Sequence, residues 1–402
     1  MKKRNGLKGL LIICIVALVL NGGLLVCSGL SPSAVKENQI PQEAENWESG
    51  RVISGETAED KIVIEPLIKR ETKRFLFVGN SMMYYNNLPE MVGSLVRAGT
   101  DFGVDPTVVV YSGRTLEEHA GAIAAVIRTK GDSRRLKKKE KPYFHLFRDT
   151  AYSEEIYNGY VERIWDSEHN CPRHFDTVIL QSYYRNGSGD SKGKEIAESI
   201  CKVIDAFDSA DTTYVVNAAT ASAKTDFEVF FKRQGKIDKA VRKGVSLAAE
   251  NAEGAYQEIQ AAVYGRAFCN YLLRYGNSYA QRTEPKAYAV YTAKEWGKGI
   301  VNDLIYGDGV HPTQLGTYLA AATIYSLLYG DPQKTIEEYR ASMHQYVTRV
   351  DGRRIGKNGN FALTYRKGKG FRSDAILRAA ADIAWRTQQE GLRLQFYAAE
   401  EL

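Results

Sequence analysis

The chain has 402 residues, of which 44% are hydrophobic and 25% charged. These proportions are ordinary for a globular protein and exclude a chain that is disordered throughout. The formal net charge of +6 includes four basic residues among the first eight, which leaves only +2 on the remainder. Five cysteines are too few for a disulfide framework. This length allows two domains at most, or one α/β domain with additions.

Residues 1–30 have the pattern of an export signal. A basic start precedes the apolar run LLIICIVALVL at 10–20, and small residues follow it. The segment could also remain as an uncleaved anchor, and LLVC at 24–27 is similar to a lipoprotein box, although Val26 is bulky for one. We therefore expect an extracellular or envelope-attached protein that contacts a membrane only through this segment. Residues 31–70 are polar and mixed, as in a linker, with a short strand expected at 61–67.

A repeating pattern of apolar and amphipathic segments begins at residue 74. Continuous apolar runs predict strands at 74–79, 106–113, 175–182, 212–220 and 286–292. Helical spacing predicts helices at 88–99, 115–128, 193–210, 240–263 and 313–330. Strands without alternation, each followed by a helix, predict a three-layer α/β/α sandwich with a mostly parallel central sheet. We assign 71–330 to this domain and interpret 331–402, which contains a predicted helix at 373–389, as an extension packed on it.

Motifs for cofactors, metals and nucleic acids are missing. GSGDSKGKE at 187–195 lacks the first glycine and the Ser/Thr of a phosphate-binding loop, and neither G-x-G-x-x-G after a strand nor H-E-x-x-H occurs. The run RRLKKKEK at 134–141 has no interleaved aromatic residues, so we interpret it as a solvated loop. We expect no cofactor, no metal and no nucleic-acid partner.

The segment FLFVGNSMMYYNNLP at 75–89 holds the first candidate for chemistry. Its apolar run stops at Gly79-Asn80-Ser81, and ligands of parallel sheets bind beyond the carboxyl ends of the strands. The hydroxyl of Ser81 would lie there at the start of the next helix, where backbone N–H groups and the positive helix end favour an oxyanion.

A second candidate lies in YGDGVHPTQLGTYLAA at 306–321. Asp308 precedes His311 by three residues, so its carboxylate can turn back to the imidazole and hold one tautomer, as in a catalytic triad. Pro312 disfavours a helix at the histidine, and Thr313 can cap the helix that follows. The alternative is an ordinary helix entry with both side chains solvated.

Together these two segments resemble the SGNH, or GDSL-like, hydrolase superfamily, in the branch whose first block reads Gly-Asn-Ser. The resemblance covers about residues 72–330 and implies a flavodoxin-like fold. It implies Ser81 as nucleophile, His311 as general base and Asp308 as the acid that orients it.

The resemblance also implies an oxyanion hole with three donors. The N–H groups of Ser81 and of Gly113, in YSGRTLEEH, fill the first two places. The third donor is normally an amide from a G-x-N-D block, which is absent after FDTVIL. We choose Gln181 for this role and retain Asn186 as a weaker candidate.

Other side chains are expected to line the substrate site. They are Asn80, Tyr84, Tyr85, Asn186 and His119. The two tyrosines could stack on a sugar or simply pack, and His119 could approach the pocket or be a structural histidine.

These residues lead us to expect an exported serine esterase that hydrolyses small O-acyl esters, such as acetyl esters on carbohydrate, through an acyl-enzyme. Its partner would be a small-molecule or glycan ester. Two alternatives remain: a lysophospholipase or thioesterase acting on long acyl chains, and a non-enzymatic glycan-binding envelope protein with the same fold. Nothing in the sequence indicates the oligomeric state.

Overall fold

The fold was analysed in a computed structural model of the whole chain. It describes residues 71–145, 149–185, 188–189, 192–209, 211–218, 220–221, 227–252, 258–275, 304–305, 310–336, 348–350, 365–367 and 374–389. The chain divides into two compact units, Met1–Ile68 and Lys69–Leu402, and all described residues belong to the second. The expected leader, the polar linker and the strands expected at 61–67 and 286–292 lie outside the described residues.

Five parallel strands form the central sheet. In sheet order they are β2 (Gly103–Val110), β1 (Thr72–Gly79), β5 (Thr177–Gln181), β8 (Thr213–Asn217) and β9 (Ile259–Ala262). Because every pairing is parallel, the carboxyl ends of the strands share one edge. After β1 the chain adds β2 on one side and then β5 on the other, so the switch point lies between β1 and β5. Ligands of such sheets bind at that point.

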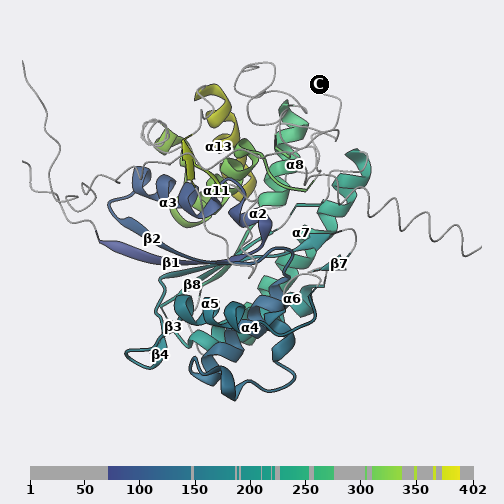
Figure 1. Cartoon of the computed structure of the whole chain (residues 1–402). Coiled ribbons are helices and arrows are strands. Elements are labelled where there is room, and N and C mark those ends of the chain that lie inside the picture. The colour runs from purple at the N-terminus through teal and green to yellow at the C-terminus, as the bar shows by residue number, and fades with distance from the viewer. Residues whose placement is uncertain are drawn as a thin grey trace, which may run out of the picture. The chain divides into compact units, whose positions relative to one another are not determined.

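Helices cover both faces of the sheet, which gives the three-layer α/β/α sandwich expected from the sequence (Figure 1). One face carries α3 (Leu88–Gly99), α11 (Gln314–Tyr329), α8 (Tyr264–Tyr275) and α13 (Asp374–Gln389). The other carries α4 (Leu116–Thr129), α5 (Glu154–Ile164) and α6 (Gly193–Phe207). The long helix α7 (Phe227–Asn251) contacts α6, α8 and β9. Helix α13 packs on α11 and α8, where Asn270 Nδ2 donates to Thr387 Oγ1 at 2.9 Å.

The remaining described elements are short. They are α2 (Ser81–Tyr84), the 3-10 turns η1 (Ser133–Arg135), η2 (Lys141–Phe144) and η4 (Pro332–Thr335), and the two-stranded pairs β3/β4 (Trp165–Asp166, Cys171–Pro172), β6/β7 (Tyr184–Arg185, Ser188–Gly189) and β10/β11 (Thr348–Val350, Tyr365–Lys367).

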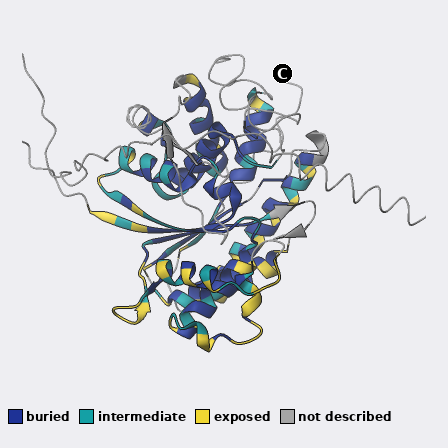
Figure 2. Ribbon diagram, viewed as in Figure 1, coloured by how far each residue is buried: buried dark blue, intermediate teal, exposed yellow. Residues whose placement is uncertain are grey.

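Burial explains why the strands are continuous apolar runs. In β1, the four residues 75–78 are each 0% exposed because helices lie over both faces (Figure 2). At the end of this strand a Cβ on Gly79 would lie 2.7 Å from Cβ of Gln181, so only glycine lets β1 and β5 approach this closely at the switch point. Within the described residues, no helix combines the length and apolar character needed to cross a membrane.

Two boundaries predicted from the sequence are wrong. The helix expected at 240–263 is observed as α7, which ends at Asn251, and residues 259–262 form the fifth strand, β9. The strand expected at 106–113 runs from Gly103 to Val110, so Tyr111, Ser112 and Gly113 belong to the loop that follows it.

Candidate active site

Ser81 lies directly beyond the carboxyl end of β1, as the first residue of α2, and is only 6% exposed. Its neighbour Asn80 holds it in place from both sides. The Asn80 Oδ1 atom accepts a hydrogen bond from the backbone N of Met82 at 3.1 Å, and its Nδ2 atom donates to the carbonyl of Arg114 at 3.1 Å. Asn80 therefore caps the helix and ties the Ser81 turn to the loop after β2, rather than projecting as a free substrate contact.

The helix behind Ser81 differs from the one expected. Helix α2 has only four residues, and the chain then passes through Asn86 and Asn87, whose φ angles of 54° and 56° are left-handed. A single turn has only a small macrodipole. It therefore lacks the electrostatic stabilisation that the N-terminus of a long helix would give to an oxyanion. Asparagine tolerates this backbone region better than most residues, which explains the unusual pair before α3.

The loop after β2 brings Gly113 to the same edge of the sheet. The N–H of Tyr111 donates to the carbonyl of Gly79 at 3.0 Å, which holds the start of this loop against the end of β1. Gly113 has a φ of 70°, a left-handed conformation that favours glycine. The two segments expected to supply backbone oxyanion donors therefore lie next to each other.

Gln181 lies at the end of β5, on the other side of the switch point, and is 1% exposed. Its Nε2 atom donates to the carbonyls of Ser182 at 3.1 Å and Asn217 at 3.2 Å. Its Oε1 atom accepts from Asn217 Nδ2 at 2.7 Å. Both amide hydrogens are thus engaged, so an oxyanion role for Gln181, which stays a prediction, requires it to release one of them.

Asn217 was not considered from the sequence, although it ends β8 as Gln181 ends β5. It is 1% exposed, and its Oδ1 atom accepts no hydrogen bond from any residue that the structure describes. Ligands of parallel sheets bind beyond the carboxyl ends of the strands. Applying this rule to β8 would have identified Asn217 as a candidate from the sequence.

The segment around His311 packs against the segment that follows Ser81. The ring of Tyr85 stacks on the imidazole of His311, with centroids 3.9 Å apart and planes at 14°. Asn86 Nδ2 donates to the carbonyl of Pro312 at 2.9 Å and to Thr317 Oγ1 at 3.1 Å. These contacts join residues more than 200 positions apart in the chain, and Tyr85 and Asn86 follow Ser81 by four and five residues.

The backbone beyond His311 is fixed by the start of α11. Thr313 caps this helix, as its sequence predicts, by accepting a hydrogen bond from the N–H of Gly316 at 3.1 Å. The N–H of Thr313 donates to the carbonyl of Leu304 at 2.9 Å, and Pro312 forms an antiparallel bridge with Ile305. Asp308 and Asn186 lie outside the described residues.

The two tyrosines after Ser81 have different surroundings. The buried hydroxyl of Tyr84 has its pKa raised by desolvation, while hydrogen bonds with the side chains of Ser112 and Ser81 act in the opposite direction. Tyr84 therefore touches the candidate nucleophile. Tyr85 is only partly buried, but His311 covers one face of its ring.

His119 lies behind the site in a buried aromatic cluster. It is 0% exposed, and its Nδ1 atom is 2.7 Å from the hydroxyl of Tyr160, which stacks on Tyr111. Burial lowers the pKa of His119 to about 3, the nearby charge of Arg114 adds to this effect, and the backbone of Gly79 opposes it. The ring is therefore neutral at ordinary pH and supports the site from within.

This buried histidine predicts acid sensitivity of the fold. Its pKa is about 3 in the folded chain and about 6.5 in the unfolded chain, so the unfolded chain alone takes up a proton between these values. Stability is therefore lost as the pH falls below about 6.5, by about 2 kcal/mol between pH 7.5 and 5. Denaturant unfolding of His119→Asn, whose amide can still bond Tyr160, should lack this loss.

The matched control is His169→Asn, since the side chain of His169 is 69% exposed. This variant should keep the wild-type loss of stability in acid. An unchanged pH dependence in His119→Asn would contradict the assignment.

No gathering of three His, Cys, Asp or Glu side chains that could hold a metal ion is found among the described residues. No family model matches the sequence, and no curated protein matches it. A search of solved structures finds a DUF4886 family protein from Bacteroides uniformis at 13% sequence identity and a TM-score of 0.40, covering 79% of this chain and 95% of that one.

Proposed function

We propose that the chain is a serine esterase of the SGNH-like type that hydrolyses small O-acyl esters, such as acetyl esters on carbohydrate. The observation that carries this proposal is the contact between the two segments with candidate chemistry, through the Tyr85–His311 stack and the Asn86–Pro312 hydrogen bond. An activated serine needs a base within reach, and the proposal is supported by the contact of His311 with the segment that directly follows Ser81. The parallel-sheet fold is compatible with the superfamily.

In the proposed reaction, the Ser81 hydroxyl attacks the ester carbonyl while His311 removes its proton. The negative charge that develops on the carbonyl oxygen is stabilised by the N–H groups of Ser81 and Gly113, with Gln181 as the proposed third donor. The protonated imidazole then gives its proton to the departing alcohol, which leaves an acyl-enzyme. A water molecule, deprotonated by His311, hydrolyses that intermediate and releases the carboxylic acid. Asp308 is the proposed carboxylate that orients His311.

The neighbours of Ser81 fix the position of the proposed nucleophile. Asn80 spends its side chain on holding the turn, and the hydroxyl of Tyr84 hydrogen-bonds Ser81. Because His311 occupies one face of Tyr85, we assign this tyrosine to positioning the base and no longer to stacking on a sugar.

A fluorophosphonate probe tests the proposal directly, because it forms a covalent adduct only with an activated serine. We expect the wild-type chain to be labelled and Ser81→Ala to be unlabelled. Ser112→Ala is the matched control, since Ser112 also lies beside Tyr84, and it should remain labelled. Absence of labelling in the wild-type chain, together with intact glycan binding, would favour the non-enzymatic alternative.

The preferred length of the acyl group can be measured separately with p-nitrophenyl esters of increasing chain length. A short-chain esterase should have its highest kcat/KM on acetyl or propionyl esters. A maximum at about eight or more carbons would indicate an apolar groove that buries each added CH₂, and would favour the lipid-hydrolase alternative.

A further inference from the structure

A strongly basic surface segment spans residues 128–141, and we call it the basic segment. It contains eight Lys or Arg residues and two acidic ones, so its net charge of +6 equals that of the whole chain. The sequence predicts a solvated loop here, but the structure shows an ordered one. It begins at the end of α4, passes through η1, and ends at η2.

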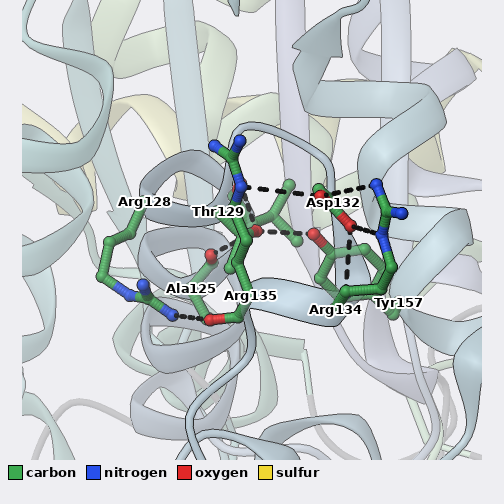
Figure 3. Close-up of polar contacts among 8 residues, drawn as sticks. Ala125, Arg128, Thr129, Asp132, Arg134, Arg135 and Tyr157 are labelled. Atoms are coloured by element: carbon green, nitrogen blue, oxygen red, sulfur yellow. Dashed lines mark hydrogen bonds and ion pairs between the residues drawn. The ribbon is translucent and has the colours of Figure 1, made fainter.

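One of its two acidic residues organises η1. Asp132 caps the turn by accepting from the N–H of Arg134 at 3.1 Å. The same carboxylate pairs with Arg134 at 2.9 Å and Arg135 at 3.5 Å, so it lies between the two guanidinium groups (Figure 3). Asp132 therefore partly neutralises two of the arginines.

The other acidic residue ties the segment to α4. Glu140 is buried, forms an ion pair with Arg128, and accepts from the N–H of Lys137 at 2.8 Å. Arg128 also donates to the carbonyl of Arg135 at 3.0 Å (Figure 3). Leu136 turns inward as well and is 9% exposed. Both carboxylates and all three arginines thus take part in ion pairs within the segment, although the side chains of Arg134 and Arg135 remain 88% and 60% exposed.

The exposed basic residues of the segment that form no ion pair among the described residues are lysines. Five lysines of the basic segment are exposed, and none of them forms an ion pair among the described residues: Lys130, Lys137, Lys138, Lys139 and Lys141. A lysine ammonium is a flexible point charge that attracts anions without fixed geometry, whereas arginine is suited to bidentate recognition. The exposed charge is therefore suited to a diffuse anionic surface.

The neighbouring surface does not favour a bound polymer strand. No aromatic residue that could stack on a base or a sugar occurs between 128 and 141. The groove beside the segment, between α4 and α6, is lined by two carboxylates, Glu198 and Asp205, and two cations, Arg128 and Lys202, so it has no excess positive charge that would draw in a polyanion. Binding to a flat array of anionic headgroups requires neither aromatic stacking nor a groove.

We propose that the five lysines of the basic segment bind the anionic headgroups of a lipid membrane. Clusters of four to eight basic residues near a bilayer are typical of such binding. If residues 1–30 remain as an uncleaved or lipidated anchor, as the sequence allows, they would hold the chain beside a membrane. The proposal adds a second membrane contact to the one expected from the N-terminal segment, and it is independent of esterase activity.

Vesicle partitioning of the full chain tests this inference. The substitution Lys137→Gln/Lys138→Gln/Lys139→Gln should lower the partition coefficient onto vesicles containing phosphatidylglycerol by about 10- to 100-fold. Binding of the wild-type chain should weaken as salt is raised, because the charges are exposed. Partitioning onto pure phosphatidylcholine should be the same in the wild type and the variant, since the N-terminal segment is common to both.

The matched control is Lys232→Gln/Lys236→Gln/Lys239→Gln, which removes the same charge from exposed positions of α7. It should change the partition coefficient by less than about threefold, as expected for net charge alone. Equal losses in the two triple variants would overturn the proposal. Loss of dextran sulfate binding without loss of vesicle binding would also overturn it, and would identify a soluble polyanion as the partner instead.

Discussion

Replacing His311 by alanine is expected to lower kcat/KM on p-nitrophenyl acetate by about 10³- to 10⁴-fold, the usual range for removal of a general base that activates a serine. The physical reason is that the neutral serine hydroxyl is a weak nucleophile until its proton is removed. Fluorophosphonate labelling of Ser81 should slow in parallel, because it needs the same base. Added imidazole should restore part of the rate by occupying the space that the substitution vacates beside Tyr85.

Variants of Tyr85 distinguish its proposed positioning role from the role of His311 as the base. Tyr85→Phe keeps the ring that stacks on His311, so its kcat should stay close to that of the wild type. Tyr85→Leu removes the stack, which is worth about 0.5–1.5 kcal/mol for a ring pair, so kcat should fall roughly three- to tenfold with KM little changed. A His311→Ala variant with wild-type activity, or a Tyr85→Phe variant as impaired as Tyr85→Leu, would contradict this assignment of roles.

The second large effect is expected at Gly316, in the first turn of α11. A Cβ at this position would lie 2.1 Å from the carbonyl oxygen of Leu304 and 3.2 Å from Cβ of Pro312. Because the closest atom belongs to the backbone, rotation of a side chain cannot relieve the clash. Gly316→Ala should therefore cost about 3 kcal/mol or more and lower the Tm by about 6–10 °C. Thermal unfolding measures the effect.

The same substitution should also slow labelling of Ser81, because residues 304–305 hold Pro312 and so the position of His311. Gly235→Ala is the control. It lies within α7, and an added Cβ meets nothing within 4 Å, so it should be neutral or stabilise the fold by up to about 1 kcal/mol. If Gly316→Ala unfolds at the wild-type temperature, the close approach of α11 to residue 304 is not a feature of the protein in solution.

Most of the sandwich could be predicted from the sequence because its strands are buried on both faces. The runs at 74–79 and 175–182 are continuous and apolar for this reason, and both are strands in the structure. The fifth strand could not be predicted, because the four residues of β9 are short and follow a long helical pattern. Their pairing with β8 is a long-range contact that local spacing does not record.

For the candidate site, the sequence by itself identified the candidate residues: a serine at a strand end, a histidine before a proline, and a threonine that caps the next helix. Only the tertiary structure decided what surrounds them. The Tyr85–His311 stack, the pairing of Gln181 with Asn217 and the enclosure of His119 all join segments far apart in the chain. The same distinction between sequence and tertiary structure applies to the basic segment. Its charges are evident in the sequence. Asp132 pairs with Arg134 and Arg135, its neighbours in the sequence, whereas the burial of Glu140 against Arg128 of α4 depends on tertiary packing that local patterns do not encode.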